Sequence, residues 1–173
     1  MNIEIKNLHY SAFASEETHC FEATVYVDGK RSFIAKNDGR GGCNDYHSFL
    51  KNTKDVGDVY QIVDRINAEL KAQGPVSGPH KRNDGSEFYL YKDIDWVVND
   101  LVNDALILKD MRRALKKIIY LHPDGSLRQM AANFKPTPDV LKAIKGASWW
   151  TDEYKLLNEM PQEEALKIWR EAA

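Results

Sequence analysis

The strongest constraint on the fold is a stretch of alternating residues that begins near residue 20. Every second residue there is apolar: Phe21, Ala23, Val25 and Val27. Successive side chains of a strand point to opposite faces, so this pattern predicts a strand with one buried face. Asp28-Gly29 follows directly, and such a pair is typical of a tight turn between antiparallel strands. We therefore expect a β-hairpin over residues 20–37.

The length of this turn decides which residues of the second strand face the core. A two-residue turn would place Ser32 and Ile34 opposite the apolar residues of the first strand. A three-residue turn, with Gly29 left-handed, would place Phe33 and Ala35 there instead. Because Phe33 and Ala35 continue the apolar face, the sequence favours the three-residue turn.

Other segments also show strand patterns. Residues 3–13 alternate imperfectly and change face near Lys6 and Asn7, which predicts an irregular first strand with a bulge. A short strand is expected at 88–91.

A second, shorter hairpin is predicted near 118–130. Pro123 presets the turn and Gly125 supplies a positive φ, which places Leu127 opposite Leu121.

The remaining apolar residues recur at helical spacing. They predict helices over about 58–72, 93–118 and 137–146, and a last helix from Pro161 onward. The segment 73–86 is rich in Gly, Pro and polar residues, and it is expected to be a mobile loop. The fold class predicted is α+β: an N-terminal antiparallel hairpin sheet packed with helices, the second hairpin, and a helical C-terminus.

Composition limits the classes of protein that this chain can belong to. Its 173 residues, 43% hydrophobic and 29% charged, suit one domain spanning 1–173. The formal net charge of −2 argues against nucleic acid as the direct partner. Two cysteines, the absence of a cationic leader and the absence of a long apolar run predict a cytoplasmic protein without membrane contact.

The segment Asn37–His47, NDGRGGCNDYH, is the first candidate for a functional site. Its glycines expose backbone amides and Arg40 adds a cation, so the loop could hold the phosphate of a nucleotide or contact a protein partner. The glycine spacing fits neither a Walker loop nor a dinucleotide fingerprint. The candidate binding residues in this segment are Asn37, Asp38, Arg40, Asn44, Tyr46 and His47.

A zinc site or a cysteine enzyme is a further alternative. His19-Cys20 and Cys43 with His47 could supply two thiolates and two imidazoles. However, neighbouring strand residues point to opposite faces, and no third residue is evident that would orient a nucleophile. We therefore assign no metal ligand, no cofactor and no catalytic residue, and we expect a protein that is not an enzyme.

Trp149 and Trp150 follow a glycine and are the second candidate site. Two large adjacent aromatic side chains are explained if one of them packs on the core and the other contacts a partner.

Several segments of the chain together resemble small, largely uncharacterised accessory proteins of bacteriophages and related mobile elements. These segments are SEETHCFEATVYVDGK, NDGRGGCNDY, DLVNDALILKDMRRALKKI and LNEMPQEEAL. The resemblance implies a protein of the infected bacterial cytoplasm that binds a host protein or ribonucleoprotein and inhibits it. Counter-defence, such as anti-CRISPR inhibition, fits this description. The alternative is a nucleotide or small-molecule binder, a signal sponge, that uses the 37–47 loop.

Overall fold

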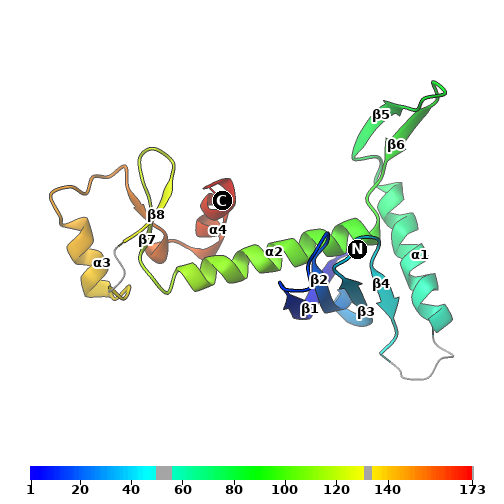
Figure 1. The fold of residues 1–173 in the computed structure, drawn as a ribbon, viewed down its shortest axis with the longest axis horizontal. Helices are drawn as coiled ribbons and strands as arrows, with labels where there is room; N and C mark the ends of the chain where they lie inside the picture. The colour runs from blue at the N-terminus through cyan, green and yellow to red at the C-terminus, as the bar shows by residue number, and fades with distance from the viewer. Residues whose placement is uncertain (50–55, 131–133, 173) are drawn as a thin grey trace. The chain divides into compact units, whose positions relative to one another are not determined.

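The computed structural model describes residues 1–49, 56–130 and 134–172 (Figure 1). They combine helices with antiparallel sheets, so the predicted α+β class is confirmed. The chain divides into two compact units, Met1–Asn103 and Asp104–Ala173. Helix α2 (Ile94–Ala114) contributes residues to both units.

A four-stranded antiparallel sheet forms the start of the first unit. Its strand order is β1-β2-β3-β4, and its strands are β1 (Ile3–Ser11), β2 (Cys20–Val27), β3 (Lys30–Asp38) and β4 (Asp45–His47). One face is buried because the alternation of β2 matches that of β3. Ala23 pairs with Ala35 and Val25 with Phe33, as the sequence predicts.

The turn that joins β2 to β3 differs from the prediction. Val27 pairs with Lys30, so the turn has two residues, and both Asp28 and Gly29 have positive φ (49° and 75°). The register nevertheless places Phe33 on the core face, because a bulge shifts the pairing between Val25 and Tyr26. The extra residue therefore lies in the strand and not in the turn. The bulge predicted in β1 is present, with a register shift between Lys6 and His9.

Two helical segments complete the core of the first unit. Helix α1 (Val56–Ala72) buries the stripe that its spacing predicts: Val59, Val63, Ile66 and Leu70. The first part of α2 buries Ile94, Val98 and Val102. The amide of Ile94 donates a 2.8 Å hydrogen bond to the Oδ1 atom of Asn67, which joins the two helices.

A separate two-stranded hairpin follows α1 (Figure 1). Its strands are β5 (Ser77–Lys81) and β6 (Glu87–Leu90). The predicted short strand is confirmed as β6. The prediction of a loop over 73–86 is wrong for β5, whose sequence, Ser-Gly-Pro-His-Lys, has no alternating apolar residues to reveal a strand.

The second unit is built around a three-stranded sheet. The strand order is β8-β7-β9, with β7 (Ile119–Leu121), β8 (Leu127–Gln129) and β9 (Lys155–Leu156). The predicted pair Leu121 and Leu127 is confirmed. Helix α3 (Pro138–Lys145), a 3₁₀ helix (Leu157–Glu159) and helix α4 (Gln162–Ala172) complete the unit.

Strand β7 separates two small apolar cores because its side chains alternate. Ile119 packs with Met111 of α2, Leu157 and Ala165 of α4. Ile118, directly before the strand, packs on the other side with residues of α3 and β9: Leu141, Ile144 and Leu156. This second core also contacts Tyr120 and Trp150, and Trp150 is one of the two candidate tryptophans.

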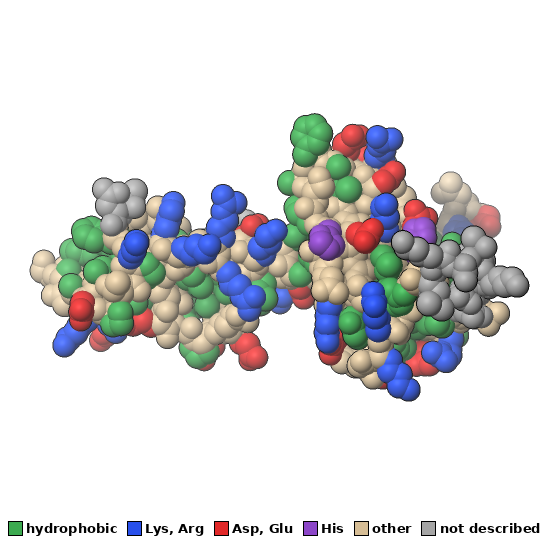
Figure 2. Space-filling view, turned by 90° about the horizontal axis from the view of Figure 1, so that it is seen from below, with side chains coloured by type: hydrophobic (Ala, Val, Ile, Leu, Met, Phe, Trp, Pro, Cys, Tyr) green, Lys and Arg blue, Asp and Glu red, His purple; other side chains and the backbone are tan. Residues whose placement is uncertain are grey.

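Charged side chains are spread over the face of the molecule shown in Figure 2. Within the described residues, no helix combines the length and the apolar character needed to span a membrane.

Candidate functional site

The glycine loop, residues 37–47, is organised around the side chain of Asn37. This residue is only 3% exposed. Its Oδ1 atom accepts hydrogen bonds from the Thr18 hydroxyl at 2.7 Å and from the Gly39 amide at 2.9 Å. Its Nδ2 atom donates to the Oδ1 atom of Asn44 at 3.0 Å and to the Gly42 carbonyl at 3.4 Å. Asn37 therefore supports the loop from within and presents nothing to a partner.

A second set of contacts joins the glycine loop to the loop between β1 and β2. The Gly39 carbonyl accepts hydrogen bonds from three successive amides: Glu16, Glu17 and Thr18. Gly39 has a φ of 86°, and a Cβ atom there would lie 2.1 Å from the carbonyl oxygen of Ala14. No residue with a side chain fits this position without moving the backbone. The two loops consequently form one bonded platform.

The backbone amides that were predicted to hold a phosphate are already hydrogen-bonded within the protein. The Gly39 amide donates to Asn37, the Arg40 amide donates to the Oδ1 atom of Asp38 at 3.2 Å, and the Gly41 amide donates to the Thr18 hydroxyl at 3.3 Å. A bound phosphate would have to replace each of these bonds. Amides already used by protein groups are poor ligands for an anion, so the geometry does not favour the nucleotide-binding alternative.

Asn44 and Tyr46 also lie inside the protein, each 6% exposed. Asn44 donates a 3.1 Å hydrogen bond to the Oδ1 atom of Asn99 on α2. The Tyr46 hydroxyl donates to Asp95 of the same helix, and its ring packs edge-on against Phe33. Burial, and then the neighbouring Asp95 carboxylate, raise the pKa of Tyr46 well above its ordinary value. The expectation that Asn37, Asn44 and Tyr46 face a partner is therefore wrong.

The other residues of the loop remain on the surface. Asp38, Arg40 and His47 are exposed. Cys43 is an exposed free thiol. A hydrogen bond to Asp95, together with the charge of that carboxylate, holds the pKa of Cys43 above its ordinary value. A protonated thiol is a weak nucleophile, so this setting is unlike that of a catalytic cysteine.

No group of three or more His, Cys, Asp or Glu side chains that could hold a metal ion occurs in the part of the chain that the structure describes. The four residues of the zinc alternative therefore do not gather at one site.

Phe13 is a surface residue that the sequence does not predict as a site. Its side chain is 100% exposed. The backbone around it is bonded: the Ser15 amide donates to the Ala12 carbonyl, and the Ser15 hydroxyl donates to the Ser11 carbonyl at 2.8 Å. Ala14, the next residue, touches Gly39 of the glycine loop. An aromatic ring is thus held on the joined loops without contact with the core. The sequence predicts a strand over residues 3–13, whereas β1 ends at Ser11 and leaves Phe13 on the loop.

Trp149 and Trp150 belong to an aromatic cluster in the second unit. The rings of Tyr120, Trp149, Trp150 and Tyr154 all contact one another, with centroids 5.0–6.4 Å apart. Rings this close leave no room between them for a ligand cation. Trp150 packs against the core and Trp149 is 45% exposed. This division matches the expectation that one tryptophan packs and the other faces outward.

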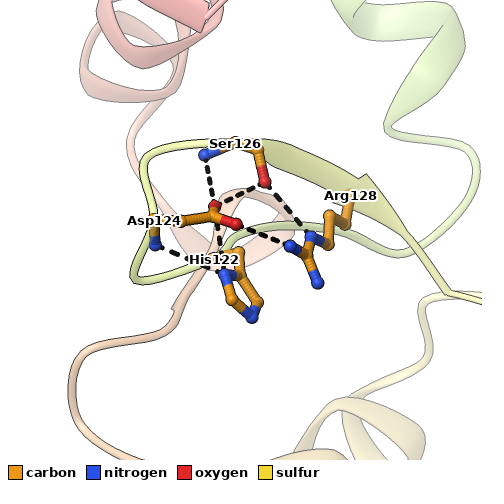
Figure 3. Close-up of polar contacts among 4 residues, drawn as sticks. All are labelled: His122, Asp124, Ser126 and Arg128. Atoms are coloured by element: carbon orange, nitrogen blue, oxygen red, sulfur yellow. Dashed lines mark hydrogen bonds and ion pairs between the residues drawn. The ribbon is translucent and has the colours of Figure 1, made fainter.

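A cluster of polar side chains lies at the turn between β7 and β8 (Figure 3). The Asp124 carboxylate accepts hydrogen bonds from the Ser126 hydroxyl at 2.6 Å and from Arg128 at 2.6 Å, and His122 lies 3.0 Å away. Ser126, followed by His122 and Arg128, holds the pKa of Asp124 well below its usual range. The carboxylate stands between the hydroxyl and the imidazole, whereas in a hydrolase triad the imidazole stands in the middle.

The hairpin β5–β6 contains the same turn without the histidine. The Asp84 carboxylate accepts from the hydroxyl and the amide of Ser86, as Asp124 does from Ser126. The arrangement in Figure 3 is therefore that of an Asp-Gly-Ser turn, and its chemistry is explained by turn stability.

Comparison with known proteins adds no relative: no protein-family model, no curated protein and no solved structure matches the chain.

Proposed function

We propose that this chain is a non-enzymatic binding protein that holds a protein partner through the surface formed by its two joined loops. We call this the double-loop surface and define it by five of the exposed side chains of these loops: Phe13, Glu16, Glu17, Asp38 and Arg40. The resemblance to bacteriophage accessory proteins supports a bacterial host component as the partner and inhibition, such as counter-defence, as the outcome.

The observation that carries this proposal is the full exposure of Phe13 on a bonded loop. Burying a phenylalanine side chain contributes about 1.5–3 kcal/mol, and Phe13 gains none of it within the described chain. An aromatic ring on a backbone that is already fixed loses little conformational entropy when a partner covers it. Phe13 thus has the properties of an interface anchor.

The charges around Phe13 indicate the kind of partner. The five side chains that define the surface include three carboxylates, Glu16, Glu17 and Asp38, and one cation, Arg40, so their formal charge is −2. Charge complementarity then favours an apolar pocket rimmed by Lys or Arg on the partner.

Affinity capture from bacterial lysate with three forms of the protein tests this proposal. We expect the wild-type protein to retain a bacterial protein in stoichiometric amount and Phe13→Ala to lose it. The matched control is Phe134→Ala, which removes a 58% exposed phenylalanine of the second unit and should retain the partner. Equal capture by all three forms, or no stoichiometric partner for the folded wild-type protein, would contradict the proposal.

A further inference from the structure

The two units carry charges of opposite sign. Residues 104–173 contain 12 Lys and Arg against 10 Asp and Glu, a formal net charge of +2. Residues 1–103 contain the other 12 basic residues and 16 acidic ones, a net charge of −4. The net charge of the whole chain is therefore close to zero although its second unit is basic. The basic residues of that unit are also unevenly distributed.

Five basic residues lie within nine positions at the end of α2. This basic stripe consists of Lys109, Arg112, Arg113, Lys116 and Lys117. All five are exposed, and Asp110 is the only acidic residue between them. In the view of Figure 2, Lys and Arg side chains lie close together in this part of α2 with few acidic side chains among them.

The basic stripe is not neutralised by the described part of the protein. Other basic residues of the second unit pair with carboxylates: Arg128 with Asp124, Lys145 with Glu159, and Arg170 with Asp104. Among the described residues, no member of the stripe forms an ion pair. Arg112 and Lys117 donate instead to neutral amide oxygens, those of Gln162 and Gln129. The cations therefore remain available to an external anion.

Helix stability alone does not account for this charge. The dipole of a helix favours cations in its last turn, which here holds Arg112 and Arg113. Lys109 lies before that turn, so the dipole does not explain why the basic residues begin there.

The absence of exposed apolar side chains on the stripe indicates whether its anion is a lipid surface or a nucleic acid. A helix that lies on a lipid surface inserts exposed aromatic or aliphatic side chains beside its cations. Here the apolar neighbours of the stripe, Leu108, Met111 and Leu115, pack inward against the core of the second unit. Cations without an apolar companion suit the phosphate backbone of a nucleic acid, which is bound largely by charge.

We propose that the basic stripe binds the phosphate backbone of nucleic acid without reading its base sequence. This goes beyond the double-loop surface, from which it is independent. It also revises the expectation, based on the charge of the whole chain, that nucleic acid is not a direct partner. The charge of the separate unit is the relevant quantity, because phosphate contacts are local and are screened over about 8–10 Å at physiological salt.

Binding of a labelled 20-base-pair DNA duplex to the full chain at several salt concentrations tests this inference. We expect wild-type binding to weaken steeply with salt. The logarithm of the binding constant should fall linearly with the logarithm of the salt concentration, with a slope of roughly −0.9 per phosphate contacted. The triple variant Lys109→Gln, Arg113→Gln and Lys116→Gln should bind about tenfold more weakly or worse at low salt. Its slope should be shallower by roughly 0.9 for each contact removed.

The control is a second triple variant with the same change in charge. Lys135→Gln, Lys142→Gln and Lys155→Gln removes three exposed lysines of the same unit outside the stripe, and it should bind DNA almost as the wild type does. Thermal melting followed by circular dichroism verifies that both variants fold. Equal weakening by both triples, absence of wild-type binding at low salt, or stronger binding to phosphatidylserine vesicles than to DNA would overturn the proposal.

Discussion

The Thr18 hydroxyl donates a 2.7 Å hydrogen bond to the Oδ1 atom of Asn37, and this bond links two loops that are 19 residues apart in sequence. The same hydroxyl accepts from the Gly41 amide, so one threonine contacts the glycine loop at two points. The platform that carries Phe13 depends on this arrangement. Asn37 and Gly39 are therefore the positions at which the platform can be tested.

Replacing Asn37 by alanine should destabilise the protein without changing its exposed surface. The change removes the acceptor of the Thr18 hydroxyl and of the buried Gly39 amide. A buried donor left without a partner costs about 1–3 kcal/mol. We expect urea unfolding to show that the free energy of unfolding falls by an amount in that range. The slope of this free energy against urea concentration should not change.

The control for this variant is Lys36→Ala, at the neighbouring exposed position of β3. It should alter the free energy of unfolding by no more than about 0.5 kcal/mol. If Asn37→Ala were as mild as Lys36→Ala, the side chain of Asn37 would not be holding the loop.

Two glycines of the same loop should respond differently to alanine. Gly39 and Gly42 both have positive φ, 86° and 91°. A Cβ atom at Gly39 would collide with the backbone of Ala14, whereas at Gly42 it would meet nothing within 4 Å. Gly42→Ala should therefore lower the free energy of unfolding only by the cost of holding alanine in the left-handed conformation, about 1–2 kcal/mol. Gly39→Ala should cost clearly more, because the two loops must separate.

Thermal melting of both variants, with limited proteolysis of the loops, measures this difference. We expect Gly39→Ala to be cut faster than Gly42→Ala between residues 12 and 19. Equal melting temperatures for the two variants would show that the contact between Gly39 and Ala14 does not hold the loops together.

Much of the fold could be predicted because its signals are local. The β2–β3 hairpin follows from alternation beside an Asp-Gly pair, and the buried face of α1 follows from helical spacing. Strand β6 was predicted, but its partner β5 was not, because β5 lacks apolar alternation. The turn between them, however, repeats the Asp-Gly-Ser of residues 124–126 at residues 84–86, so the second copy of that motif could have indicated the hairpin.

The candidate site was less predictable because its contacts are distant in sequence. Asn44 bonds with a residue 55 positions away and Tyr46 with one 49 positions away. Polar residues among glycines have the same sequence pattern whether they face water or one another. Asn44 and Tyr46 bond with α2, and the sequence of the loop does not indicate which helix lies beside it. The exposure of Phe13 was not predicted because the alternation places it at the end of a strand over 3–13, whereas β1 ends at Ser11.

The buried Tyr46 hydroxyl should make the stability of the protein depend on alkaline pH. The pKa of Tyr46 is raised in the folded state above the ordinary value of 10.0 that applies to the unfolded chain. As the pH rises through about 10, the unfolded chain loses this proton first and so binds fewer protons than the folded protein. The free energy of unfolding must therefore fall with rising pH in this range, while below pH 10 the contribution of Tyr46 is fully present.

Tyr46→Phe tests this linkage when unfolding by urea is followed between about pH 8 and 11. The variant should start less stable by about 1 kcal/mol, because the hydrogen bond to Asp95 is lost, and should then lose less stability above pH 10. Tyr60→Phe, at an exposed tyrosine of α1, is the matched control and should follow the wild-type curve. Identical alkaline slopes for the two variants would mean that Tyr46 ionises as readily in the folded protein as in the unfolded chain, and that its bond to Asp95 does not keep it protonated.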